Sequence, residues 1–560
     1  MPQLDLEELA GRYGTIALAS LAIHMGVGTF LSWAIEHGLL GPTSRVILGF
    51  IAAGIVAGVG VWVRDRHDAR FGNVLLALAL AIVHVDAWAA GPRLHVLSPV
   101  GALAIAAAAS AALAALALTA DARTLFVVGF AGALAAPFVT SSKPGNVILL
   151  LSYGWVVIAT GIFAIRERGW RLILWLTVLG GIVYVAAAES VPHASGASWM
   201  NVHIPTLFAF ACAAAALVWA RETLRSKLAL AFLLVAAFAT LGYVGDLSVM
   251  QIALPLVGTI AAYAITRELE TDRTWQVIGN VVIPLAFLAT AIISSTGRTP
   301  AALAAVVQTV IAALMIWDAD EEERPQHLFV TAVASGIAIV AYLIDSDTRC
   351  IGALALHAAL FSVALRTSRA KLLAAPIFIS LAISSVWTFY LLTARANYGY
   401  VPFGGIPSLC AIAVVIAWAI FAGVLRVEGH QPADPEVAPF EFVTILAISA
   451  AFMWVRQELV AAYSPDLATF LIIIYYALAG LALIFAGRQR TRGLWRFAGL
   501  ALAFYAGYKA LAESSSIDAI ALRVGVRILV GFFLAAVAFW YRAPRDPAAG
   551  TTAATPTAAV

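Results

Sequence analysis

Seven ionisable side chains lie within long apolar stretches of the sequence, and they are the first candidates for chemistry. They are Asp86, Arg456, Glu458, Lys509, Glu513, Arg523 and Arg527. Placing such a residue in the middle of a membrane-spanning helix costs about 2.5 to 3.5 kcal/mol on insertion scales, so it usually faces another charge, a polar cavity or a ligand. We therefore take these side chains as the candidate site.

Arg523 and Arg527 form the most specific pattern within this set. They are four residues apart, which places both guanidinium groups on one face of a helix, one turn apart. Two neighbouring positive charges repel unless an anion lies beside them, and arginine binds carboxylates and phosphates through paired hydrogen bonds. Glu458 and Glu513 are candidate anions within the chain, and the phosphate or carboxylate of a lipid or substrate is the candidate outside it. A closed ion network, or side chains that extend to the membrane surface, would explain the same pattern without a ligand.

The histidines within apolar stretches give weaker signals. His84 and Asp86 are two residues apart and point in different directions on a helix, so this pair alone does not predict a metal site. His24 and His357 are single histidines, which are more often hydrogen-bonded packing residues than proton carriers. No metal ligand is assigned to any of them.

The composition shows which elements must position these residues. The chain has 560 residues, of which 62% are hydrophobic and 12% charged, whereas about a quarter of a soluble domain is charged. Its apolar runs of about 17 to 23 residues are each long enough to cross a roughly 30 Å hydrocarbon core as a helix. The runs are continuous and do not alternate with polar residues, which favours helices over a barrel. We predict an all-α, polytopic integral membrane protein of about 20 transmembrane helices.

The predicted segments divide the chain into three parts. Residues 1–12 form a short head, residues 13–542 the helical transmembrane domain, and residues 543–560 a disordered tail rich in Pro, Ala and Thr. The first apolar run follows LDLEEL instead of a basic stretch, so we expect it to be retained as a helix. The segments begin near Tyr13, Val46, Asn73, Val100, Thr124, Val147, Leu172, Ile204, Leu228, Met250, Val277, Ala301, His327, Ile351, Leu372, Pro407, Phe440, Ala468, Leu494 and Ala519.

Lys and Arg residues mark one side of the membrane. Most of those between apolar segments, including the clusters RDRHDAR, RERGWR and RQRTR, lie on the same side as the N-terminus. Because basic loops stay in the cytoplasm, both termini are predicted to be cytoplasmic. The seven candidate residues then lie in the outer half of the membrane.

The sequence lacks the residue patterns of nucleic-acid-binding proteins, of several enzyme classes and of disulfide-rich proteins. The basic residues do not form the dense face that duplex nucleic acid would need. The chain contains no phosphate-loop, HExxH, GxSxG or CxxC motif, and no cofactor is predicted. Cys212, Cys350 and Cys410 are isolated, so neither a disulfide framework nor a thiolate metal site is indicated.

The start of the chain resembles a family of predicted bacterial membrane proteins, domain-of-unknown-function family 2339. The stretch GRYGTIALASLAIHMGVGTFLSWAIEHGLLGPTSRVILGF carries the resemblance through Arg12, Gly14, Gly38, Gly41, Pro42, Arg45 and Gly49. The stretch GALAAPFVTSSKPGN is similar to the turn at the family's fifth helix through Gly132, Pro137, Gly145 and Asn146.

The final hairpin is similar to the closing pattern of the same family. The matching residues are Lys509, Arg523, Arg527 and Tyr541. The resemblance implies a bacterial inner-membrane protein with many helices. It brings no established reaction, so it implies no catalytic residue.

These observations favour transport or flipping of an anionic or envelope-related, lipid-linked substrate through a polar vestibule in the outer half of the membrane. The residues that would attract the anion are Arg456, Lys509, Arg523 and Arg527. The residues that would balance charge or carry protons are Asp86, Glu458 and Glu513. The expected partners are the lipid bilayer and an anionic lipid or lipid-linked substrate.

Two alternatives stay open, so the sequence does not decide whether the protein is an enzyme. The first is a membrane-embedded transferase that uses a lipid-linked sugar, with Glu36, Asp86, or the pair Asp345 and Asp347 as acid, base or metal ligands. The second is a noncatalytic scaffold, which faces of small residues such as those in GALAIAAAASAALAALAL would allow.

Overall fold

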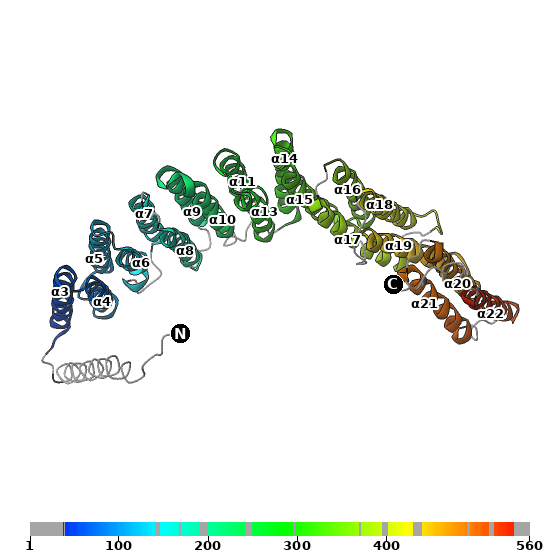
Figure 1. The fold of residues 1–560 in the computed structure, drawn as a ribbon, viewed down its shortest axis with the longest axis horizontal. Helices are drawn as coiled ribbons and strands as arrows, with labels where there is room; N and C mark the ends of the chain where they lie inside the picture. Colours follow the sequence, from blue (N-terminus) through cyan, green and yellow to red (C-terminus); the bar gives the residue numbers. More distant parts are fainter. Residues whose placement is uncertain are drawn as a thin grey trace, which may run out of the picture. The chain divides into compact units, whose positions relative to one another are not determined.

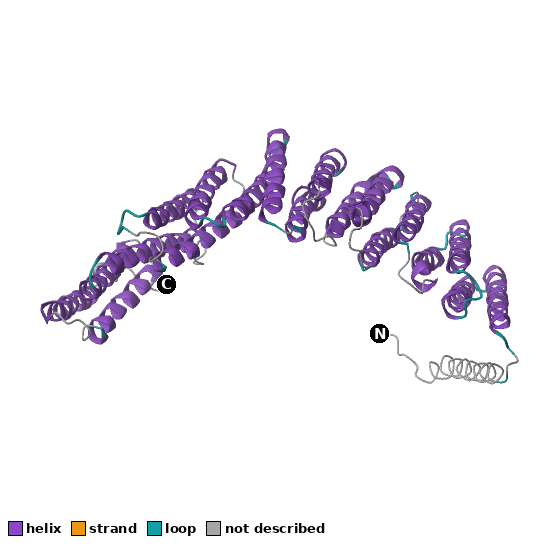
Figure 2. Cartoon of the chain, turned by 180° about the vertical axis from the view of Figure 1, so that it is seen from behind, coloured by secondary structure: helices purple, strands orange, loops and turns teal. Residues whose placement is uncertain are grey.

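A computed structural model describes most of the chain, and the secondary-structure elements within that part are helices (Figure 2). The described residues are 37, 40–140, 146–166, 168, 170–190, 199–240, 249–295, 297–368, 371–394, 401–428, 439–489, 493–513 and 520–542. The segment predicted from Tyr13, with His24 and Glu36, lies outside these residues, as do the predicted head 1–12 and tail 543–560. The chain divides into two compact units, Met1–Pro300 and Ala301–Val560.

The first unit is built from successive helical hairpins. Its helices are α3 (Pro42–Arg66), α4 (Ala69–Trp88), the π-helical turn η2 (Ala89–Arg93), α5 (Pro99–Thr119), α6 (Arg123–Thr140), α7 (Val147–Ile165), α8 (Arg171–Glu189), α9 (Trp199–Trp219), α10 (Glu222–Ala239), α11 (Val249–Leu269), α12 (Arg273–Val277), the π-helical turn η4 (Ile278–Val282) and α13 (Ile283–Ser294). Several of these helices begin with a proline in the first turn or with a polar residue that caps the first turn. Ser98 accepts a hydrogen bond from the Gly101 amide before α5, and Asn146 accepts from the Ile148 amide before α7.

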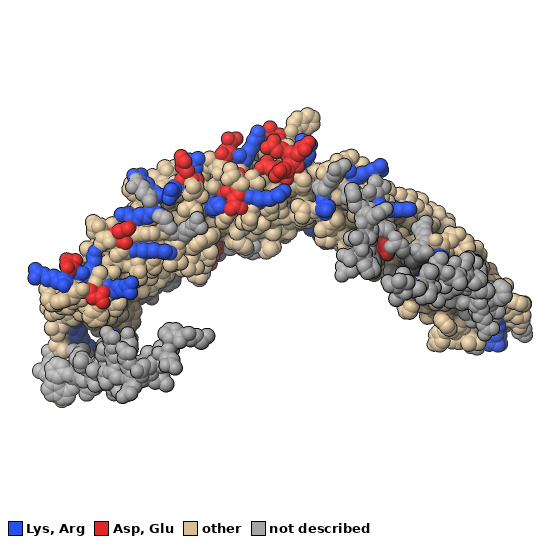
Figure 3. All heavy atoms as spheres, in the orientation of Figure 1, with Lys and Arg blue, Asp and Glu red and all other residues tan. Residues whose placement is uncertain are grey.

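The hairpins of the first unit stand in two rows. Helices α3, α5, α7, α9 and α11 form one row, and α4, α6, α8, α10 and α13 form the other (Figure 1). Each hairpin packs mainly against the hairpins before and after it in the chain. The turns within the hairpins therefore lie at one end of the unit. Figure 3 shows many Lys, Arg, Asp and Glu side chains of this unit on the face turned toward the viewer.

The second unit packs around two central helices, α16 and α20. Its helices are α14 (Arg298–Asp318), α15 (Arg324–Leu343), α16 (Asp347–Ser368), the 3-10 turn η5 (Lys371–Leu373), α17 (Ala374–Thr393), α18 (Ile406–Glu428), α19 (Pro439–Ala462), α20 (Pro465–Gln489), α21 (Gly493–Ala512) and α22 (Ile520–Arg542). Helix α16 packs against α15, α17 and α18, and α20 packs against α19, α21 and α22. Glycines bring α20 and α21 close together, because a Cβ on Gly499 would lie only 2.7 Å from the carbonyl oxygen of Gly480.

The predicted segments from Val46 onward each coincide with a helical segment, in the predicted order. Within the described residues, 15 helices are long and apolar enough to cross a membrane. The all-α, multi-helix membrane fold is therefore confirmed. The total of about 20 helices and the cytoplasmic position of both termini stay predictions.

Candidate functional site

Two of the four predicted cations, Arg456 and Lys509, lie at neighbouring aromatic rings in the second unit. Arg456 Nε on α19 donates a hydrogen bond of 2.7 Å to the hydroxyl of Tyr476 on α20. The ring of Tyr476 lies 5.5 Å from the ring of Tyr505 on α21, measured between centroids. Lys509 Nζ lies 5.8 Å from the centroid of the Tyr505 ring, within range of a cation–π interaction. The rings of Tyr476 and Tyr505, which we call the tyrosine bridge, thus connect the two cations.

Lys509 also has a carboxylate partner on its own helix. It forms an ion pair with Glu513, four residues later. The Lys509 side chain is 18% exposed and that of Glu513 is 45% exposed, so the pair lies at the end of α21 where burial decreases. One of the predicted charge-balancing residues therefore neutralises one of the predicted anion-binding residues.

Glu458 has a described contact with the backbone of the segment before α18. Its side chain is completely buried, and one carboxylate oxygen accepts a hydrogen bond of 2.8 Å from the backbone amide of Phe403. Phe403 has a positive φ of 57°, and its ring lies edge-on to Trp454, one turn before Glu458 on α19. The Trp454 indole donates a hydrogen bond of 3.1 Å to the hydroxyl of Ser408 on α18. Glu458 and Trp454 together hold the segment 401–405 against α19.

Arg527 lines a cavity of about 330 Å³ between α21 and α22. Gly507 and Gly531 leave room for this α21–α22 cavity. The apolar part of its wall comes from side chains of both helices, among them Phe504, Tyr508, Leu511 and Val530. Arg523 lies one turn earlier on α22 than Arg527. The arrangement offers one guanidinium group within an otherwise mostly apolar wall.

The α21–α22 cavity adjoins the tyrosine bridge. Tyr508 lines the cavity, and its ring lies 6.5 Å from the ring of Tyr505. Because Tyr505 also contacts Lys509, a short chain of aromatic rings leads from the wall that contains Arg527 to Arg456. Three of the predicted cations thus belong to one connected group of side chains, which no spacing in the sequence would reveal.

Asp86 belongs to the first unit, whereas the other six predicted residues belong to the second. It lies in the last turn of α4, directly before the π-helical turn η2. Its side chain is 9% exposed, and Oδ2 has no hydrogen-bond partner within the part of the chain that the structure describes. The carboxyl group presses against α3 at Gly49, where an added Cβ would lie 2.5 Å from both Cγ and Oδ1 of Asp86. A buried carboxyl group of this kind is a candidate for exchanging a proton or a cation.

Helix α6 is surrounded by polar side chains at the position of Pro137. Proline lacks the N–H group that would otherwise bond to the carbonyl of Ala133. The hydroxyl of Tyr153 on α7 donates a hydrogen bond of 2.9 Å to that carbonyl. The carbonyl before it lies 3.1 Å from Nε2 of His84, and the carbonyl after it accepts a hydrogen bond of 2.9 Å from the hydroxyl of Tyr184. His84 therefore has a packing role in the structure.

The other histidine and the acidic triplet also have partners in neighbouring helices. Nε2 of His357 lies 3.0 Å from the carbonyl of Ala332 on α15, and its other ring nitrogen lies 3.3 Å from the hydroxyl of Ser380 on α17. His357 is thus hydrogen-bonded between helices, and its role stays a prediction. The indole of Trp387 donates a hydrogen bond of 2.9 Å to Asp347. Within the described ranges, no group of three His, Cys, Asp or Glu side chains could hold a metal ion.

The family described as "predicted membrane protein (DUF2339)" has a model that matches residues 15–412. The chain belongs to this family. No curated protein and no solved structure matches the chain. The family therefore establishes a membrane protein and names no reaction.

Six of the seven candidate residues lie outside the part of the chain that matches the DUF2339 model. The match covers α3 to α17 and the start of α18, which include Gly49, Asp86 and His357. The tyrosine bridge and the α21–α22 cavity lie beyond residue 412. The similarity of the final hairpin to the family thus stays a prediction.

An apolar cavity in the DUF2339 protein has no counterpart among the sequence predictions. It has a volume of about 400 Å³ and lies between α17, α18 and α19 of the second unit. Its wall includes Phe378, Trp418, Met453 and Trp454, and the Trp418 indole donates a hydrogen bond of 2.9 Å to Ser385. Apolar and aromatic residues of this kind occur in every membrane helix, so no sequence signal distinguishes them from ordinary packing residues.

Proposed function

We propose that this protein transports or flips an anionic, envelope-related amphiphile across a bacterial cytoplasmic membrane, with the α21–α22 cavity as its outer binding site. The observation that carries the proposal is the presence of Arg527 in the wall of a cavity between two membrane helices. The Arg527 side chain is exposed on α22. A cation at lipid depth is costly, and an anionic head group beside it would lower this cost. The predicted orientation of the chain assigns the cavity to the outer half of the membrane.

The chemistry of the cavity wall fits an amphiphile. Arg527 can bind a phosphate or carboxylate through two hydrogen bonds, and Tyr508, which carries a hydroxyl, also lines the cavity. Phe504, Leu511 and Val530 present apolar surface to an acyl or isoprenoid chain. A volume of about 330 Å³ is at the lower end of ordinary ligand pockets, so it would hold a head group and the first part of a chain.

The tyrosine bridge supports movement of charge away from this cavity. An anion that leaves Arg527 would meet Lys509 and then Arg456, each of which contacts a ring of the bridge. Glu513 is already paired with Lys509, so the arriving anion would compete with this carboxylate. Such competition is a simple way to make binding reversible, as transport requires.

The first experiment fills the cavity without disturbing the packing of the helices. A Cβ added at Gly531 would meet no atom within 4 Å, so Gly531→Leu can place its side chain in the cavity. Gly352→Leu on α16 is the matched control, because a Cβ there also has free space and the residue lies away from the cavity. The protein is reconstituted into vesicles with a fluorescent phosphatidylglycerol, and transfer between leaflets is followed by chemical quenching of the outer leaflet.

The second experiment removes the charge. Arg527→Gln should reduce the rate of transfer by about tenfold, the value of one charge-assisted hydrogen bond, whereas Arg366→Gln on α16 should not. Phosphatidylcholine should be transferred slowly by all variants. If the unmodified protein does not accelerate transfer of the anionic lipid, or if both site variants equal their controls, the proposal is wrong and the scaffold alternative becomes the better one.

A further inference from the structure

A third cavity, which lies in the first unit, combines basic and aromatic side chains. It has a volume of about 560 Å³ and lies between α8, α10 and α12. Its charged wall consists of Arg221 and Lys227, and Trp175 and Trp275 form much of its aromatic wall. Among the residues that the structure describes, no carboxylate lines this basic-aromatic cavity.

The cavity lies at the end of the unit where the hairpin turns and most basic residues are found. Arg221 directly precedes α10, Trp175 lies in the second turn of α8, and Trp275 lies within the short helix α12. Tryptophan is enriched at the level of lipid head groups, and basic residues favour the cytoplasmic surface. The residue types and their position in the helices are therefore those of a membrane–water interface.

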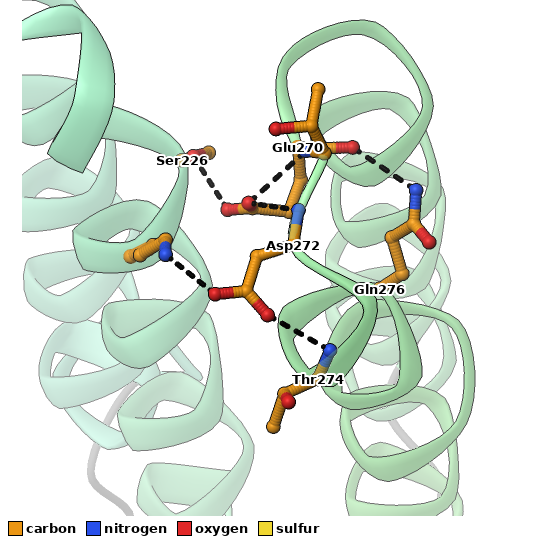
Figure 4. Close-up of polar contacts among 7 residues, drawn as sticks. Ser226, Glu270, Asp272, Thr274 and Gln276 are labelled. Atoms are coloured by element: carbon orange, nitrogen blue, oxygen red, sulfur yellow. Dashed lines mark hydrogen bonds and ion pairs between the residues drawn. The ribbon is translucent and has the colours of Figure 1, made fainter.

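Two carboxylates near the cavity, Glu270 and Asp272, are held by other groups of the protein (Figure 4). Glu270 accepts a hydrogen bond of 2.8 Å from the hydroxyl of Ser226 and another of 2.9 Å from the amide of Asp272. Asp272 accepts from Lys227 Nζ at 2.9 Å and from the Thr274 amide at 3.0 Å. The hydrogen bond from Lys227, followed by that from the Thr274 amide, lowers the pKa of Asp272 below its ordinary value of 3.8, so this carboxylate stays ionised.

This arrangement fixes Lys227 and leaves Arg221 available at the cavity wall. Asp272 holds Lys227 in place between α10 and the start of α12. Arg221 forms no ion pair with any of the residues that the structure describes, and it lines the cavity. A ligand with an anionic head would therefore meet one ordered ammonium group and one unpaired guanidinium group.

The aromatic side chains define the rest of the ligand. The rings of Trp175 and Trp275 are nearly parallel, at an interplanar angle of 25° with centroids 6.3 Å apart. The Trp175 side chain is 56% exposed, so it offers apolar surface at the rim. Leu174, Leu224 and Leu228 add aliphatic surface. A ligand that satisfies both walls has a negative head and an apolar part directly beside it.

We infer that the basic-aromatic cavity binds the phosphate head group of an anionic phospholipid from the leaflet on this side of the membrane. Arg221 would bind the phosphate, and the Lys227 ammonium, held by Asp272, would donate a further hydrogen bond to it. Trp175 would pack against the start of the acyl chains. This site is separate from the α21–α22 cavity and does not depend on transport. A bound lipid would fix α8, α10 and α12 relative to the membrane surface.

The test uses the full chain in nanodiscs of phosphatidylcholine that contain a minor fraction of phosphatidylglycerol. Lipid that stays bound after release into detergent is identified by native mass spectrometry. Arg221→Gln and Trp175→Ala should each reduce retained phosphatidylglycerol at least about fivefold. Arg225→Gln is the matched control, since Arg225 lies four residues later on α10 and does not line the cavity.

A second arm distinguishes a lipid from a soluble anion. Inorganic phosphate is added to protein in neutral detergent, and thermal stability is measured with and without it. Stabilisation by phosphatidylglycerol but not by phosphate, lost in Arg221→Gln, supports the lipid assignment. Equal stabilisation by phosphate alone, or equal lipid retention by Arg221→Gln and Arg225→Gln, overturns it. Because the variants lie in the first unit, lipid transfer through the α21–α22 cavity should be unchanged, so the two proposals fail independently.

Discussion

The contact between Gly49 and Asp86 predicts a large effect from a single added methyl group. In Gly49→Ala, the new Cβ would lie 2.5 Å from Cγ and Oδ1 of the Asp86 carboxyl group. Ordinary carbon contacts are about 3.5 to 4.0 Å, so α3 and α4 must separate by about 1 Å or the carboxyl group must leave its position. Overpacking of this kind costs about 1 to 3 kcal/mol, and we expect the free energy of unfolding to fall by that amount.

A glycine on the same helix provides the control. A Cβ at Gly54 would meet no atom within 4 Å, so Gly54→Ala introduces the same methyl group without a collision. Alanine favours a helix over glycine by about 1 kcal/mol, so Gly54→Ala should be neutral or stabilising. The helix preference for alanine favours both variants alike, so they should differ by the overpacking cost of about 1 to 3 kcal/mol, although each adds one methyl group to α3.

The carboxyl group itself is tested by a double-mutant cycle. Asp86→Ala removes the atoms that collide, so Gly49→Ala should have little cost in that background, with a coupling energy of about 1 to 3 kcal/mol. The free energy of unfolding is measured for all four proteins by steric trapping in bicelles, with the trapping sites in α3 and α4. Equal stabilities of Gly49→Ala and Gly54→Ala, or an unchanged cost of Gly49→Ala in Asp86→Ala, would refute the proposed contact.

Two further predictions concern the first unit. Tyr153→Phe should destabilise this unit by about 1 to 2 kcal/mol, because the Ala133 carbonyl loses its hydrogen-bond donor. This cost should be smaller in the Pro137→Ala background, where residue 137 regains an N–H group that can bond to the same carbonyl. Equal costs in both backgrounds, measured by the same unfolding assay, would contradict this account. The pKa of Asp272 is lowered by Lys227, so its contribution to stability is present above about pH 4 and is lost as the pH falls through the folded-state pKa. The effect should be small because the pair is exposed, should weaken in high salt, and should be absent in Asp272→Asn when thermal unfolding is compared between pH 3 and pH 6.

The helices could be predicted from the sequence because a membrane segment is encoded locally. A continuous apolar run of sufficient length determines a spanning helix whatever its neighbours are, which is why the segments from Val46 to Ala519 coincide with helical segments of the structure. The candidate ionisable residues could be predicted for the same reason. A charge in an apolar run is visible without knowledge of its partner.

The partners of those residues could not be predicted, because they depend on how helices pack. Arg456 and Lys509 are connected through Tyr476 and Tyr505, and nothing in the spacing of these residues indicates it. The hydrogen bond from the backbone amide of Phe403, in the loop before α18, to Glu458 could not be predicted either, and the role of Glu458 as a counter-ion for the arginines stays a prediction. The cavities are even harder to predict from the sequence, because they form where the side chains of neighbouring helices leave space between them.

The row of hairpins in the first unit has a consequence for biogenesis and for change in length during evolution. Each hairpin is predicted to cross the membrane twice, and it packs against the hairpins before and after it in the chain. A newly synthesised hairpin can therefore leave the insertion machinery and dock at once, without waiting for distant parts of the chain. Duplication or loss of one hairpin would also leave the orientation of every later helix unchanged, because two crossings return the chain to the side from which it started.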